Sequence, residues 1–70
     1  MAIKIQRLPS VIQDTGLSRG TIFRRVAAGE FPIPIPLGSG RAVGWIESEV
    51  QAWLAEQVEA ARSNNIQYKA

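Results

Sequence analysis

The fold that we predict is decided by residues 13–30, which read Gln-Asp-Thr-Gly-Leu-Ser-Arg-Gly-Thr-Ile-Phe-Arg-Arg-Val-Ala-Ala-Gly-Glu. Thr15 and Gly16 end one helix, because glycine accepts the left-handed conformation with which many helices close. Leu17 is the apolar residue of a short turn. The stretch therefore predicts a helix-turn-helix, in which a second helix follows the turn at once.

The second helix is predicted from Arg19 to about Ala28. Ser18 caps its start, because a serine oxygen at this position accepts from the unpaired N–H groups of the first turn. Gly29 follows the last helical residue and terminates the helix.

The two faces of this helix differ in character. At 100° per residue, Ile22 and Val26 share one face and Arg24 lies opposite them. Phe23 lies at the border. A long cation among small residues suits the major groove of DNA, because the helix can approach closely while the cation reaches phosphate or guanine. An ordinary surface helix with solvated arginines is the alternative. The residues that flank Arg24 are Gly20, Thr21, Ala27 and Ala28.

Residues 31–37 read Phe-Pro-Ile-Pro-Ile-Pro-Leu, so prolines alternate with apolar residues. Alternate N–H groups of a strand point to opposite sides, and the three prolines therefore remove donors from one side only. Ile35 and Leu37 keep their donors for a partner strand. We predict an edge strand that is protected against further pairing. The alternative is a polyproline-type ligand for an aromatic groove.

A hairpin with a glycine-rich tip is predicted next. Residues 38–41 read Gly-Ser-Gly-Arg and form its turn, and residues 42–45 form its second strand. We interpret this hairpin as a wing, in which Ser39 and Gly40 allow backbone N–H groups near a phosphate and Arg41 supplies charge. A plain turn that needs glycine for its dihedral angles is the alternative.

The two ends of the chain give weaker patterns. Residues 1–8 alternate in part and predict a short strand or an extended arm. Pro9 and Ser10 then open the first helix. The last helix starts near residues 46–49, where Ser48 and Gln51 are predicted to form a capping box. Its apolar stripe consists of Val50, Trp53, Leu54, Val58 and Ala61.

We predict that Trp53 and Trp45 lie in the core, because a short chain needs large side chains to bury enough apolar area. Base stacking is the alternative role for either ring. Residues 62–70 lack periodicity and are predicted to form a flexible tail. Residues 1–61 would then be the folded domain.

Composition excludes several classes of protein. Seventy residues suffice for one domain, which buries only about 60% of its unfolded surface. The chain has no Cys and no His, so it lacks thiolate ligands and the usual general base. No apolar run approaches the roughly 18 residues of a membrane span, and the first residues lack the apolar core of a signal peptide. We expect no enzyme, no cofactor, no metal and no membrane partner, and a cytoplasmic location.

Charge is distributed unevenly along the chain. Six of the eight basic residues fall between Lys4 and Arg41, together with two acids, whereas residues 42–70 hold four acids and two bases. This asymmetry suits a polyanionic partner on one side of the molecule.

In this arrangement the residues resemble the AlpA family of small phage-type regulators, which is related to excisionases and more distantly to the DNA-binding part of the MerR regulators. The resemblance covers about residues 6–60. The matching segments are Arg-Leu-Pro at 7–9, Thr-Gly-Leu-Ser-Arg at 15–19, Thr-Ile-Phe-Arg at 21–24, Ala-Gly-Glu-Phe-Pro at 28–32, Pro34, Leu-Gly at 37–38, Val-Gly-Trp at 43–45, Glu-Val at 49–50 and Ala-Trp-Leu at 52–54.

The resemblance implies an α+β, mostly α, compact winged helix-turn-helix of the MerR and excisionase type, with a two-stranded wing and a C-terminal amphipathic helix. The second helix would enter the major groove, and the wing would follow the backbone or the minor groove. Departures from the family occur at Phe23, where Tyr is common, at Gly20, where Ser is common, and at Pro36, where a basic residue is common. The DNA contacts predicted from the resemblance and from the basic and wing positions are Ser18, Arg19, Gly20, Thr21, Phe23, Arg24, Arg25, Ser39, Gly40 and Arg41.

We therefore expect a sequence-specific double-stranded DNA-binding transcription regulator of prophage or mobile-element origin, associated with the nucleoid of a bacterial or phage-infected cell. An excisionase that bends attachment-site DNA and steers an integrase shares the same fold. A protein-binding inhibitor domain is a third function for it. We expect a monomer or weak dimer in solution and several copies on neighbouring DNA sites.

Overall fold

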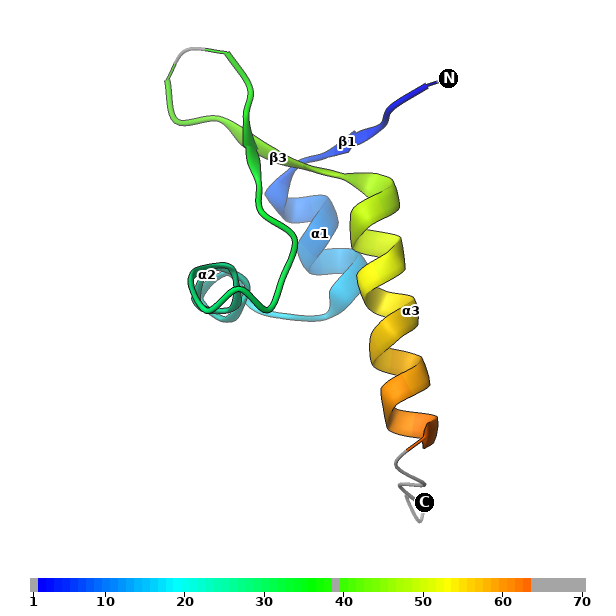
Figure 1. Cartoon of the computed structure of the whole chain (residues 1–70). Helices are drawn as coiled ribbons and strands as arrows, with labels where there is room; N and C mark the ends of the chain where they lie inside the picture. Colours follow the sequence, from blue (N-terminus) through cyan, green and yellow to red (C-terminus); the bar gives the residue numbers. More distant parts are fainter. Residues whose placement is uncertain (1, 39, 64–70) are drawn as a thin grey trace.

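A computed structural model describes residues 2–38 and 40–63. It has an α+β fold that is compatible with a winged helix, and α2 and α3 lie on opposite sides of α1 (Figure 1). None of the helices in the described ranges combines the length and the apolar character that a membrane crossing needs. The elements in chain order are β1 (Ile5–Gln6), α1 (Leu8–Thr15), α2 (Arg19–Ala27), β2 (Ile35–Pro36), β3 (Val43–Ile46) and α3 (Glu47–Ser63).

The predicted helix-turn-helix is confirmed at both of its junctions. Gly16 ends α1 with φ of 74°, and its N–H donates to the carbonyl of Ile12 at 2.8 Å. Ser18 caps α2, because its Oγ accepts from the N–H of Thr21 at 3.3 Å. Gly29 follows α2 with φ of 75°, a conformation that favours glycine.

The predicted hairpin that we interpret as a wing is also confirmed, and it belongs to a larger sheet than we predicted. The strand order is β1-β3-β2 with antiparallel pairing, so β1 adds a third strand to the expected hairpin. In β2 the prediction of a protected edge is correct: Leu37 donates its N–H to the carbonyl of Ala42 at 2.9 Å, while Pro36 has no N–H to offer.

Gly44 explains why β1 can lie so close to β3. A Cβ atom at this position would overlap Cγ2 of Ile5 and would lie 3.1 Å from both the Gln6 carbonyl oxygen and Cδ1 of Leu37. Glycine therefore leaves the space that the side chains of the two neighbouring strands occupy.

The core draws one buried apolar side chain from each of the three helices, one from β3 and one from the segment after α2. Trp45 is fully buried, as predicted, and its Nε1 donates to the carbonyl of Pro32 at 2.8 Å. Trp53 is only half-buried, so its predicted place in the core is correct in part: its ring packs edge-on against Phe31 at 4.8 Å between centroids. The buried apolar residues are Val11, Ile22, Phe31, Trp45 and Val50.

The predicted capping box of α3 is wrong. Strand β3 runs into α3 without a loop, so the helix begins at Glu47 and Ser48 lies inside its first turn. The N–H of Glu47 donates to the carbonyl of Lys4 at 2.8 Å. Gln51 donates instead to Oδ2 of Asp14 at 3.3 Å.

The apolar stripe of α3 contributes to the core only as far as Leu54. Val58 and Ala61 are exposed, because the second half of the helix extends past the rest of the molecule (Figure 1). The helix continues through Arg62 to Ser63. Residues 64–70 of the predicted tail lie outside the described residues.

One polar side chain is buried beneath the sheet. Gln6 is 5% exposed, and its Nε2 donates to Oγ of Ser10 at 2.9 Å and to Oδ2 of Asp14 at 2.8 Å. Its Oε1 is buried without a hydrogen-bond partner. This amide joins β1 to α1 and, through Asp14, to Gln51 of α3.

Candidate nucleic-acid interface

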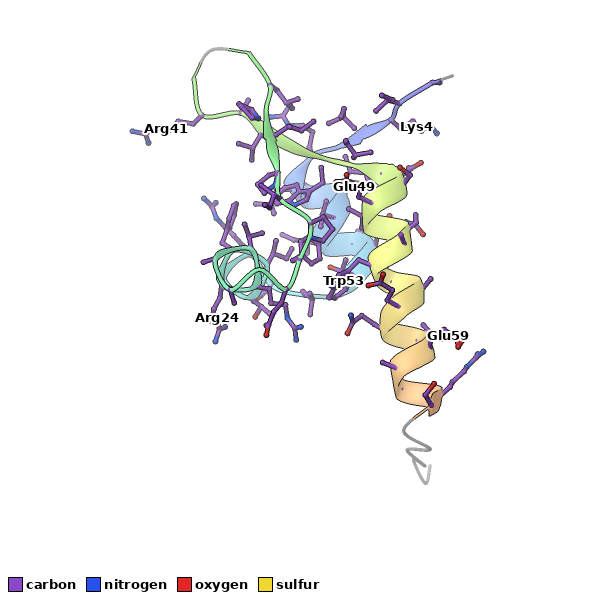
Figure 2. The ribbon with its side chains drawn as sticks, viewed as in Figure 1. Lys4, Arg24, Arg41, Glu49, Trp53 and Glu59 are labelled. Atoms are coloured by element: carbon purple, nitrogen blue, oxygen red, sulfur yellow. The ribbon has the colours of Figure 1, made fainter. Side chains whose placement is uncertain are left out.

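The exposed face of α2 is built around Arg24. Ile22 is fully buried on the inner face, and Arg24 is exposed on the opposite side, as the helical wheel predicts. In Figure 2 the side chain of Arg24 points away from the rest of the molecule. Its Nη2 donates to Oγ1 of Thr21 at 3.4 Å, a weak contact that leaves the guanidinium free to bind a ligand.

The residues that flank Arg24 on the outer face of α2 are small. At Gly20 no atom lies within 4 Å of the position that a Cβ would take, so packing within the protein does not require glycine there. Ala27 and Ala28 are exposed on the same side of the helix. Small side chains at these positions permit the helix to approach another molecule closely.

The two hydroxyl groups at the start of α2 bind each other. Ser18 donates its hydroxyl to Oγ1 of Thr21 at 2.9 Å and accepts the N–H of the same residue. This pair fixes the first turn and leaves other N–H groups of that turn unpaired, an arrangement that favours anions.

Phe23 and Arg19 form the edge of α2 that faces the sheet. The Phe23 ring is half-buried, with its centroid 5.9 Å from that of Trp45. The Arg19 guanidinium lies over the outer side of Phe23, with Cζ 5.8 Å from the ring centroid. Phe23 therefore anchors the helix and positions Arg19, which remains exposed.

Arg25 and Arg24 line the same hollow beside α2, but Arg25 contacts a different neighbour. Arg25 is half-buried on the side that faces α3, and its Cζ lies 5.9 Å from the centroid of Trp53. Nε1 of Trp53 donates to the carbonyl of Glu30 at 2.8 Å, which holds the ring in place. The helical wheel contains this signal, since Arg25 lies 100° from Arg24 in the direction of Ile22.

The wing places Arg41 at a second exposed site. Gly38 and Gly40 have φ of 85° and 95°, so the turn itself requires glycine at both positions. Arg41 follows the turn and points away from the molecule (Figure 2). Ser39, also predicted to contact DNA, lies outside the described residues.

Charge is segregated between two sides of the molecule. Arg24 and Arg41 lie on the side formed by α2 and the wing, whereas Glu49 and Glu59 lie on α3 at the other side (Figure 2). Lys4 and Glu30 depart from this division, since Lys4 lies on the side of α3 and Glu30 lines a hollow with Arg24. A polyanion would be attracted to the first side and repelled by the second.

The sequence was compared with known proteins. The profile of the family described as "Prophage CP4-57 regulatory protein (AlpA)" matches residues 4–58. An uncharacterized protein of Enterobacteria phage P4 is 46% identical over 74% of this chain, and the match spans only 58% of that protein's length. The DNA-binding transcriptional activator AlpA of Escherichia coli is 40% identical over 80% of this chain and 87% of its own. No solved structure matches significantly.

Proposed function

The chain belongs to the AlpA family, and from this membership we propose that it is a sequence-specific transcription regulator that binds double-stranded DNA. Its Escherichia coli relative is described as a DNA-binding transcriptional activator. We further propose a prophage or mobile-element origin, because the family is that of a prophage regulatory protein.

The placement of Arg24 carries this proposal. It is an exposed guanidinium on the outer face of a capped helix, opposite the fully buried Ile22, with Gly20 leaving open space beside it. An α-helix fits the major groove, where arginine pairs with the O6 and N7 atoms of guanine. In this binding mode Arg24 reads a base, and the first turn of α2 contacts a phosphate.

The other cations have separate roles in the proposal. Arg41 contacts the DNA backbone from the wing and adds affinity without sequence preference. Arg19 lies over the ring of Phe23 at the edge of α2 and contacts an adjacent phosphate. Arg25 supports α2 from behind through Trp53.

An excisionase would use the same residues on a different DNA site. The order of helix, turn, helix and wing is consistent with a relation to excisionases and MerR-type domains. The DNA site that the protein binds, a promoter or an attachment site, distinguishes a transcription regulator from an excisionase. A protein that bends attachment-site DNA changes the mobility of the complex according to the position of the site in the fragment.

A footprint of the purified protein tests the proposal. The probes are the DNA upstream of its own gene, any neighbouring attachment site, and random DNA of equal length. Protection of a discrete upstream sequence is expected. Arg24→Ala should require about 5- to 150-fold more protein for the same protection, and Arg62→Ala is the matched control, because Arg62 is an exposed arginine on α3. Binding that is equal on all three probes, or absent, would refute a sequence-specific regulator.

A further inference from the structure

The outer face of the sheet, which turns away from the core, is apolar. Residues that pair across antiparallel strands point to the same side, so Ile5 and Ile46 share a face, and Ile35 lies on it opposite Gly44. The close contact of Ile5 and Leu37 above Gly44 confirms this side. Small antiparallel sheets usually present polar residues to solvent, so this face requires an explanation.

This face continues into an open groove between residues 29–35 and α3. The groove has a volume of about 900 Å³, and Ile33, Ile46 and Trp53 contribute its apolar surface. Ile33 is 73% exposed. Three carboxylates line the same groove: Glu30, Glu49 and Glu56.

A second apolar segment carries a positive charge, opposite to that of the carboxylates in the groove. Residues 2–4, which we call the arm, precede β1 and include Ile3 and Lys4. Ile3 is 70% exposed. The arm leads away from the rest of the molecule, so it does not fill the groove of its own chain (Figure 1). In Figure 2 Lys4 lies on the same side as α3, away from Arg24 and Arg41.

We propose that the arm of one copy docks in the groove of a second copy. Ile3 would meet the apolar surface of the groove, and the ammonium of Lys4 would approach the carboxylates of Glu49 and Glu56. The prolines of the β2 segment exclude docking by strand addition, because they remove the outer N–H donors. The arm therefore docks through its side chains.

A symmetric contact of groove against groove is disfavoured, because it would oppose the carboxylates of the two copies. The contact of arm with groove joins two different surfaces, and such contacts form open chains of molecules unless the rotation between copies closes a ring. A few isoleucines bury far less than the roughly 1,200 Å² of a stable complex, so copies free in solution associate weakly. When two copies bind neighbouring DNA sites, the local concentration of each copy near the other rises and the contact forms. This step rests on the proposed function.

Cysteine cross-linking tests the contact without DNA. The chain has no cysteine of its own, so a disulfide reports only the introduced pair. Copies with Ile3→Cys are mixed with copies with Ala52→Cys, since Ala52 is an exposed lining residue of the groove. The mixed disulfide should form on the order of tenfold faster than in a control mixture of Ile3→Cys with Gln13→Cys, because docking holds the two thiols within bonding distance.

Exchange of charged residues provides a second test. Lys4→Glu, combined with Ile3→Cys, should remove the enhancement, and Glu49→Lys in the Ala52→Cys copy should restore it. On a duplex with two adjacent sites, Lys4→Glu should lose cooperativity and keep its affinity for a single site. Equal cross-linking rates in all mixtures, or a dominant disulfide between two Ala52→Cys copies, would overturn the proposal. DNA binding without cross-linking overturns this contact alone, and cross-linking without DNA binding overturns the proposed function alone.

Discussion

Arg24 and Arg25 are adjacent residues of the same type, and the structure assigns them opposite roles. Replacing either one by alanine removes one positive charge from α2. Arg24 is exposed with no aromatic contact recorded among the described residues, whereas Arg25 lies over the ring of Trp53. We therefore expect Arg24→Ala to weaken DNA binding and Arg25→Ala to weaken the fold.

The size of the Arg24 effect follows from its place on the outer face of α2. An arginine that pairs with a guanine contributes about 1–3 kcal/mol, which corresponds to a loss of about 5- to 150-fold in affinity. The 3.4 Å contact with Thr21 is too weak to support the helix, and alanine is a better helix former than arginine. The free energy of unfolding should stay within about 0.5 kcal/mol of that of the wild type.

The size of the Arg25 effect follows from its contact with Trp53. A cation over an aromatic ring at a partly exposed site contributes about 0.5–1 kcal/mol. In a domain of this size that loss lowers Tm by about 2–8 °C. The charge of Arg25 should affect DNA binding only through long-range electrostatic attraction, and salt at about 0.1 M largely screens that attraction.

The assay combines thermal unfolding with DNA binding at 50 and 200 mM salt for both variants. The wild type and Arg62→Ala serve as references, because Arg62 is an exposed arginine outside the proposed interface. If Arg25→Ala loses more DNA affinity than Arg24→Ala while its Tm is unchanged, the orientation that we assign to α2 is refuted.

Three further predictions concern the wing, the helix surface and the core. Arg41→Ala should weaken binding equally on specific and random DNA and lower the salt slope of log K by about 1; an unchanged slope would mean that the wing does not contact phosphate. Gly20→Ala should stabilise the fold by about 0.4–1 kcal/mol in urea denaturation, because a Cβ meets only open space there; it should also weaken DNA binding, and a loss of stability would contradict the structure. Trp45→Ala should cost about 3–5 kcal/mol of unfolding free energy, and Trp53→Ala should cost clearly less, because Trp45 is fully buried and Trp53 only half-buried; equal losses in thermal denaturation would contradict this ranking.

Features that depend on local sequence were predictable. Gly16 and Ser18 set the ends of the first two helices by hydrogen bonds that span only a few residues. The prolines of residues 32–36 specify an edge strand, because missing N–H donors constrain any sheet that contains them. The face of α2 that carries Arg24 follows from helical geometry alone.

Features that depend on distant contacts were not predictable in the same way. The pairing of Ile5 with Ile46 joins residues far apart in the sequence, and its only local signal is Gly44 within a strand pattern. The capping box of α3 was predicted wrongly because Ser48 is a good cap in isolation, but the helix begins one residue earlier and the backbone of Lys4 already satisfies the N–H of Glu47. Tertiary contacts override local capping preferences here.

The buried amide of Gln6 determines how far the arm projects. Strand β1 has only two residues, and isoleucine at positions 3 and 5 would keep the outer face apolar if the strand slipped by two residues. That slip would carry the ammonium of Lys4 into the site that now holds a neutral amide bonded to Ser10 and Asp14. The amide thus fixes the pairing register, although its own Oε1 stays without a partner. A slipped strand would change the free length of the arm by about 7 Å, so one glutamine sets the reach of the segment that we propose joins neighbouring copies.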